Sequence, residues 1–225
     1  MATLADLERA VDQLMGHALG YQYYRLNRRV KEKAYEAYVF GLCLRAADEL
    51  GATPVLLGAR RERAVPFVFR GGPGQIHSTA KNYGYAGFTL RGQHFEIHSG
   101  VEFKGTSGMT HELDVCVMRQ AEAAKCRQRP DDPEPASLVA AWECKFYSGD
   151  LQKVLGRAFV GLLDDMGTAV RVTGMCSNSG HPGLRMYFAP QRRPHPHFEL
   201  SPLQPSNEDI FVNQLKGALK KLTRD

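Results

Sequence analysis

The sequence predicts an α/β domain with a mixed β-sheet flanked by helices and an N-terminal helical extension. Helical periodicity dominates residues 1–50. From residue 51 the sequence changes to short alternating segments bounded by turn residues, which is typical of strands. A strand, an amphipathic helix and a second strand between residues 137 and 176 predict a βαβ unit. We therefore expect one domain over residues 1–225, with helices in 1–50 and the sheet core and a C-terminal helix in 51–225.

The composition is that of a packed globular chain. Hydrophobic residues make up 43% and charged residues 24% of the 225 residues, which excludes overall disorder. No apolar run is long enough to cross a membrane. The N-terminus lacks a basic segment followed by an apolar one, so we expect no signal peptide and no membrane partner. The odd number of scattered cysteines makes a reducing cytoplasm the expected location. The five cysteines form no CxxC pair, which disfavours a disulfide framework and a structural zinc site, and the net charge of +5 permits a polyanionic partner.

Four segments carry the apolar spacing of helices. Thr3 and Asp6 form a capping-box-like pattern at the start of the first, and Ser206 is expected to cap the last in the same way. Gly51 is the expected terminator of the second. The helices are expected to begin near Thr3, to span about Val30–Leu50 and Leu151–Met166, and to begin again at Ser206.

Strand-like segments fill the middle of the chain, separated by turn residues such as Gly100. Two short apolar runs, Pro54–Leu57 and Val65–Phe69, precede them. The polar stretch Arg119–Pro135 is interpreted as an exposed connection, longer than a compact domain usually contains. The expected strands are Ala86–Leu90, Phe95–His98, Val101–Lys104, Glu112–Met118, Ser137–Phe146, Ala169–Cys176 and Leu184–Ala189.

The strand Ser137–Phe146 carries charge where a central strand is usually apolar. Because side chains alternate along a strand, Glu143 and Lys145 share one face, and Trp142, Cys144 and Phe146 share the other. Burying a carboxylate and an ammonium group costs several kcal/mol unless they are paired or bind an ion. Pairing or ion binding is therefore expected at this strand.

Asp114 lies in a similar setting, with Glu112 and Cys116 on its face of the strand and Leu113 on the opposite face. If this strand is a neighbour of the Glu143 strand, both carboxylates point into one pocket. Two carboxylates with water and a backbone carbonyl, such as that of Cys144, form an oxygen site that suits Mg²⁺, with Mn²⁺ as a substitute. The Lys145 ammonium group beside such an ion could orient a water molecule or stabilise charge on a phosphoryl group.

Asp114 followed by Glu143-Cys-Lys145, on two apolar strands ahead of an amphipathic helix, resembles the pattern of the PD-(D/E)xK nuclease superfamily. The resemblance implies a restriction-endonuclease-like fold in which Asp114 and Glu143 are metal ligands and Lys145 is the catalytic lysine. It also makes Glu36 the candidate acidic residue on an early helix. Leu113 stands where the family pattern has proline, and the connection between the two motif strands is long unless Arg119–Pro135 loops out.

Basic residues near these motifs are candidate nucleic-acid contacts. Lys153 and Arg157 follow the motif strand one helical turn apart, and Arg28 and Arg29 lie in a basic segment before the second helix. Arg60, Arg61 and Arg63 are further candidates. A solvated helix face explains the segment with Arg28 and Arg29, and the group of Arg60, Arg61 and Arg63, at least as well, and the same alternative applies to Glu36.

The sequence therefore predicts a divalent-metal-dependent nuclease that hydrolyses phosphodiester bonds, endonucleolytic on DNA. Analogy with relatives adds a homodimer and a role in defence against foreign DNA. The alternatives are a non-catalytic DNA-binding or assembly module on the same fold, a carbohydrate-active hydrolase, and a solvent-facing ion pair on an edge strand. Outside the motifs, His111 is interpreted as structural, and His195–His197 as a surface loop.

Overall fold

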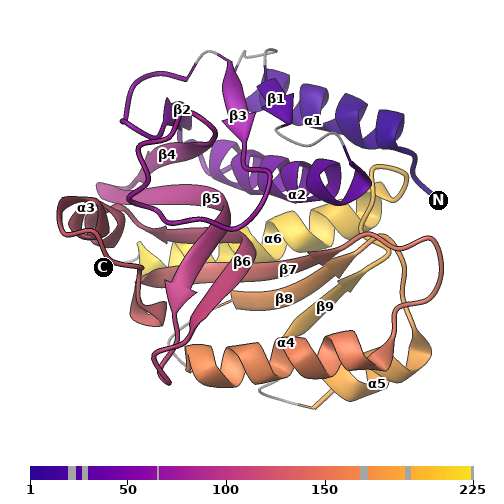
Figure 1. The fold of residues 1–225 in the computed structure, drawn as a ribbon. Coiled ribbons are helices and arrows are strands. Elements are labelled where there is room, and N and C mark those ends of the chain that lie inside the picture. Colours follow the sequence, from indigo (N-terminus) through magenta and orange to yellow (C-terminus); the bar gives the residue numbers. More distant parts are fainter. Residues whose placement is uncertain (20–23, 27–29, 65, 168–171, 191–193, 224–225) are drawn as a thin grey trace.

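The computed structural model describes the chain except residues 20–23, 27–29, 65, 168–171, 191–193 and 224–225 (Figure 1). Arg28 and Arg29 thus lie outside the described residues. The helices are α1 (Leu4–Leu19), α2 (Lys31–Asp48), α3 (Gln120–Gln128), α4 (Lys153–Met166), α5 (Pro182–Phe188) and α6 (Pro205–Leu222), with a 3₁₀ turn at Pro135–Ser137. The strands are β1 (Tyr24–Leu26), β2 (Val55–Gly58), β3 (Phe67–Phe69), β4 (Gly84–Leu90), β5 (Gln93–Lys104), β6 (Thr110–Arg119), β7 (Leu138–Lys145), β8 (Val172–Ser177) and β9 (His195–Phe198).

The main sheet has seven strands in the order β2-β4-β5-β6-β7-β8-β9. Pairing is antiparallel from β2 to β7 and parallel from β7 to β9. Strands β1 and β3 form a separate parallel pair. The predicted mixed α/β architecture is therefore confirmed, and the parallel pairing of β7 with β8 across α4 confirms the predicted βαβ unit.

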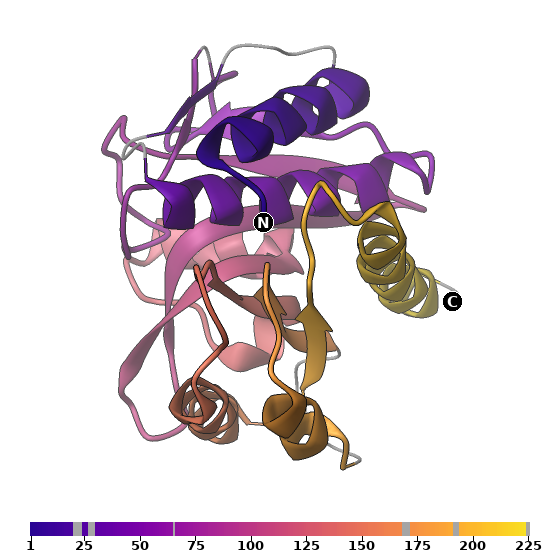
Figure 2. The same cartoon turned by 90° about the vertical axis from the view of Figure 1, so that its right-hand side faces the viewer.

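Helices cover both faces of the sheet (Figures 1 and 2). On one face, α2 and α6 pack against the sheet and α1 lies outside α2. The other face is covered by α4 and α5, with α3 at one end. Trp142 of β7 is fully buried, and its ring lies 4.8 Å from that of Phe211 on α6. The motif strand β7 is thus in the interior of the sheet, with helices on both sides.

The N-terminal helices form as their sequence signals predict. The Asp6 carboxylate accepts a 2.8 Å hydrogen bond from the Thr3 N–H, and the Asp6 N–H donates to the Thr3 hydroxyl at 3.2 Å. Helix α2 ends near Gly51, whose φ of +80° suits glycine. Most of α2 is buried because the helix lies between α1 and the sheet.

Two predicted elements are wrong in type. Leu184–Ala189 is not a strand but lies in α5, which Pro182 begins and whose His181 side chain accepts the Gly183 N–H at 3.0 Å. A short apolar run fits either element, and the proline and the cap favour the helix. The exposed connection expected at Arg119–Pro135 contains helix α3, which is anchored by a buried ion pair described below.

Three further details of the predicted strands and helices are wrong. Gly100, with φ of +59°, does not end a strand, because β5 continues through it from Gln93 to Lys104. Leu113 and Val115 are expected on the same face of β6. Leu113 instead packs in the cluster that contains Cys116, whereas Val115 packs in a different cluster. The alternation of side chains therefore breaks between these two residues, where β6 passes Gly100. Helix α6 begins at Pro205 with Gln204 as its cap, because proline favours the first helical position over Ser206.

The predicted surface loop at His195–His197 is instead part of strand β9. His197 is buried, and its ring packs 5.0 Å from that of Phe211. Among the described residues, no helix is long and apolar enough to cross a membrane.

Candidate functional site: a carboxylate and lysine cluster at the end of two strands

The centre of the site is a contact between the two motif strands. Strands β6 and β7 are neighbours, and their last register pair before the site is Val115 with Trp142. Beyond that pair, Asp114 Oδ2 accepts a 2.7 Å hydrogen bond from the backbone N–H of Cys144. The Asp114 side chain thus occupies the place of a backbone acceptor and is fixed beside Glu143 and Lys145.

Lys145 joins the two carboxylates of the predicted motif. Its Nζ lies 3.8 Å from Asp114 Oδ2 and forms an ion pair with Glu143. Glu143 and Lys145 are half-buried while Trp142 and Cys144 are buried, which confirms the predicted alternation. Since β7 lies between β6 and β8, the alternative of a solvent-facing pair on an edge strand is wrong.

Helix α2 brings a second charged pair to the same place. Glu36 is only 6% exposed, so the expectation of a solvated helix face is wrong for this residue. Lys33 Nζ donates to both carboxylate oxygens of Glu36 at 2.8 Å and lies 4.0 Å from Glu112 Oε1. Both lysines are therefore held by carboxylates, Lys33 on α2 and Lys145 on β7.

Burial and mutual repulsion shift the protonation of the acidic groups. Burial, and then the charge of Asp114, raise the pKa of Glu36 to about 8. Burial and the Asp114 charge also raise the pKa values of Glu112 and Glu143 above the ordinary value. Burial alone would lower the pKa of Lys145, but the charges of Asp114 and Glu143 outweigh it and raise that pKa. Lys33 and Lys145 therefore stay charged. Their two positive charges do not fully offset the negative charges of the surrounding carboxylates.

A cleft opens over these groups, with a volume of about 850 Å³. Its lining combines Asp114, Cys144 and Lys145 of the motif strands with the first turns of α2 and the segment after β7, and Glu143 is not part of it. The other lining residues are Lys31, Glu32, Lys33, Glu36, Phe146, Tyr147, Ser148 and Leu155. The predicted contacts Lys153 and Arg157 are exposed on α4, the helix that places Leu155 in this lining. Their role in binding nucleic acid stays a prediction.

The oxygen donors of this cluster are carboxylates, which are the side-chain groups that a hard cation prefers. Within the described ranges, no group of three or more His, Cys, Asp or Glu side chains is arranged to hold a metal ion. Mg²⁺ commonly uses only one or two carboxylates and keeps waters and phosphate oxygens as its other ligands. Asp114 and Glu143 supply that number, and buried Glu112 Oε1 makes no hydrogen bond. These residues fit such an ion, and the Cys144 carbonyl as a ligand stays a prediction.

Lys33 was absent from the residues that the sequence predicts for the site. The signal that could have found it is its spacing of one helical turn from Glu36, which is typical of a pair on one helix face. Asn178 was also missed: its side chain accepts the Tyr147 N–H at 2.8 Å and donates to the Tyr147 carbonyl at 2.9 Å. This clamp extends the β7–β8 pairing beyond Lys145 and fixes one wall of the cleft.

A separate polar cluster lies on β5, away from the cleft lining. Arg127 of α3 donates to Glu96 through two nitrogens, at 2.9 and 2.6 Å, and His98 Nε2 lies 2.8 Å from Glu96 Oε2. Glu96 and His98 are each 1% exposed. This bidentate pair anchors α3 to the sheet.

His111, which the sequence predicts to be structural, makes contacts that agree with that role. His111 Nε2 lies 2.5 Å from Asp165 Oδ2, and Ser107 donates to the same carboxylate through its N–H and hydroxyl, each at 2.7 Å. This network ties the turn between β5 and β6 to the end of α4.

No protein-family model matches the chain, and no curated protein is significantly similar to it. A functional interpretation therefore depends on the geometry of the cleft and on the sequence motif that forms it.

Proposed function

We propose that this protein is a divalent-metal-dependent nuclease of the PD-(D/E)xK type with a restriction-endonuclease-like fold, acting on DNA. The observation that carries the proposal is the convergence of Asp114, Glu143 and Lys145 at the end of two adjacent interior strands. The resemblance makes Asp114 and Glu143 metal ligands and Lys145 the catalytic lysine, and the contacts of Lys145 with both carboxylates support these roles. Glu36, buried beside Asp114, stands where the early-helix acidic residue is expected.

The charge of the cleft supports a cationic cofactor. Among the described residues in and beside the cleft there are five carboxylates when all are ionised (Glu32, Glu36, Glu112, Asp114 and Glu143) and three ammonium groups (Lys31, Lys33 and Lys145). Asp114 and Glu143 would hold the ion. A bound Mg²⁺ would polarise the scissile phosphate and lower the pKa of a coordinated water molecule. Its two positive charges would also balance the excess of carboxylates.

The residues of the chain have distinct tasks in the proposed hydrolysis. The Lys145 ammonium group orients the attacking water and offsets the negative charge that grows on the phosphoryl oxygens. The Cys144 N–H holds the Asp114 carboxylate in place through the 2.7 Å hydrogen bond. Water adds its oxygen to phosphorus, one P–O ester bond breaks, and the departing alkoxide takes a proton, which leaves a phosphomonoester and an alcohol.

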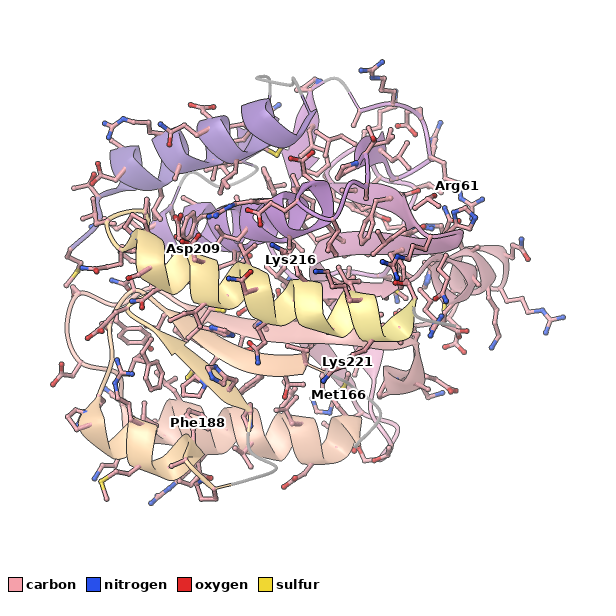
Figure 3. The ribbon with its side chains drawn as sticks, turned by 180° about the vertical axis from the view of Figure 1, so that it is seen from behind. Arg61, Met166, Phe188, Asp209, Lys216 and Lys221 are labelled. Atoms are coloured by element: carbon pink, nitrogen blue, oxygen red, sulfur yellow. The ribbon has the colours of Figure 1, made fainter. Side chains whose placement is uncertain are left out.

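The test is cleavage of supercoiled plasmid and of single-stranded DNA with and without Mg²⁺ or Mn²⁺. The wild type is compared with Lys145→Met and with the matched control Lys216→Met. Lys216 is also a half-buried lysine, paired with Glu49 at 2.7 Å, but it lies on α6 (Figure 3). We expect metal-dependent cleavage that is lost in Lys145→Met and retained in Lys216→Met. Equal activity of the two variants would refute the proposed role of Lys145.

The second candidate is a non-catalytic DNA-binding module on the same fold. The net charge of +5 favours it. Salt-dependent DNA binding without metal-stimulated cleavage would support this candidate over the nuclease. A carbohydrate-active hydrolase would instead turn over glycosides without a divalent metal ion.

A further inference from the structure

A second set of charged residues lies away from the cleft, around Gln93 at the start of β5. The Gln93 side chain donates to the Leu222 carbonyl at the end of α6 at 3.0 Å. The same side chain accepts a 3.2 Å hydrogen bond from Arg119 at the end of β6. Gln93 thus joins three segments: the β4–β5 turn, the end of β6 and the last turn of α6.

Each of these three segments presents exposed cations. They are Arg91 in the turn, Arg119 at the end of β6, and Lys220 and Lys221 on α6, and we call them the Gln93 surface. Within the part of the chain that the structure describes, none of the four forms an ion pair with a carboxylate. Lys220 and Lys221 also suit the C-terminal end of a helix dipole, whereas the two arginines have no such role.

The backbone at Arg91 supplies an independent observation. Leu90 pairs with Gln93, so Arg91 and Gly92 form a two-residue hairpin turn, with φ values of +50° and +79°. Such a turn strongly favours asparagine or glycine at its first position, because other side chains are strained at positive φ. Arg91 therefore occupies a backbone position that is strained for its side chain, and that side chain is exposed to solvent.

The surface is separate from the cleft. Arg119 follows Met118, which pairs with Leu138 at the start of β7, whereas Lys145 ends that strand. At about 3.3 Å per residue, the eight-residue strand β7 separates the two regions by about 23 Å. Figure 1 shows the C-terminus and α3 at one end of the molecule, and β7 running from there toward the other end.

We propose that the Gln93 surface binds the phosphate backbone of a nucleic acid. Guanidinium and ammonium groups without carboxylate partners are the groups that contact phosphates. An anionic membrane is less suitable, because surface binding to lipid usually combines basic and apolar side chains. Among the described residues, the exposed large hydrophobic side chains all lie outside these three segments. This proposal rests on the proposed function in one respect: that function is the reason for choosing nucleic acid rather than another polyanion as the ligand.

The test measures binding rather than cleavage, so it is separate from the test of the nuclease. Fluorescence anisotropy of a labelled DNA duplex is recorded in EDTA over a series of NaCl concentrations. The variants are Arg91→Asn and the triple variant Arg119→Gln, Lys220→Gln, Lys221→Gln. The matched control is Lys81→Gln, which also removes one exposed positive charge but lies just before the start of β4, at the opposite end of that strand from Arg91.

We expect Arg91→Asn to weaken binding and to reduce the slope of log K against log salt by about 0.9, the value for one lost phosphate contact. The triple variant should weaken binding further. Because asparagine suits positive φ, Arg91→Asn should also show a raised Tm, whereas Lys81→Gln should keep the wild-type affinity.

Three results would overturn the proposal. One is wild-type affinity in Arg91→Asn and in the triple variant. Another is an equal loss in Arg91→Asn and Lys81→Gln, which would show an effect of net charge alone. The third is binding of the wild type to phosphatidylserine vesicles but not to DNA. A protein that binds DNA through this surface without cleaving it would refute the nuclease and leave this proposal intact.

Discussion

The Asp114 carboxylate accepts a 2.7 Å hydrogen bond from the backbone N–H of Cys144, the residue between Glu143 and Lys145. This bond makes the position of one motif residue depend on the backbone of the other motif strand. The Asp114 carboxylate accepts the hydrogen bond that a backbone carbonyl of the neighbouring strand would otherwise accept, so both its position and its orientation are fixed. The bond therefore gives separate predictions for the geometry and for the charge of Asp114.

Asp114→Asn should keep the fold and lose activity. The amide oxygen of asparagine can still accept the Cys144 N–H, but the negative charge is gone. Asp114→Ala should in addition lower the free energy of unfolding by about 1–3 kcal/mol, because a buried N–H loses its acceptor. Chemical denaturation compares the two variants. Equal stability of Asp114→Asn and Asp114→Ala would show that the hydrogen bond contributes little.

Glu36 should make the metal-free protein less stable as the pH rises. Burial, and then the Asp114 charge, raise the pKa of Glu36 from an ordinary 4.5 to about 8, so between these values the folded state binds more protons than the unfolded state. The free energy of unfolding then falls with rising pH, by at most about 1.4 kcal/mol per pH unit for one group. Glu36→Gln should flatten this dependence between pH 5 and 8, and Mg²⁺ should flatten it in the wild type. A parallel pH profile of the variant would contradict the assignment.

Lys33→Met should destabilise the protein in a pH-dependent manner. Lys33 donates to both oxygens of Glu36, so its loss leaves a buried carboxylate without its main cation. At pH 8 we expect a loss of about 1.5–3 kcal/mol, the value for a charged hydrogen bond. Near pH 5, where Glu36 is protonated, the loss should be smaller. A loss that does not change with pH would indicate that only the packing of the Lys33 side chain matters.

His197 should make the protein sensitive to acid. Burial, and then the neighbouring His195, lower the pKa of His197 from 6.5 to about 4, so between these values the folded state binds fewer protons than the unfolded state. This contribution to stability is present above pH 6.5 and is lost as the pH falls toward 4, by about 3 kcal/mol in total. The free energy of unfolding of His197→Leu, measured from pH 7 to 4, should decrease less than that of the wild type.

The parts of the site on the strands could be predicted from the sequence. Strand residues alternate with a period of two, so Glu143 and Lys145 necessarily share a face once Trp142 is placed in the core. The neighbouring position of Asp114 needed only the pairing of β6 with β7, which follow each other as strands along the chain. Short-range patterns therefore contain most of the information about this centre.

The remaining parts depend on tertiary contacts that no local pattern encodes. Helix α3 was missed because its anchor, the pair between Arg127 and Glu96, joins residues far apart in the sequence. The position of Glu36 depends on which face of α2 meets the sheet, and α2 is buried on almost all sides. The break in alternation at Leu113 depends on Gly100, which lies in the neighbouring strand.

The most direct test of the central claim is single-turnover cleavage of an end-labelled DNA duplex with Mn²⁺, in wild type and Lys145→Met, with Mn²⁺ binding measured in parallel. The account predicts that both proteins bind the ion through Asp114 and Glu143. It also predicts that the variant cleaves about 10²–10⁴-fold more slowly. Metal-independent cleavage, or cleavage by Lys145→Met at the wild-type rate, would contradict the assignment of this cluster as a nuclease centre.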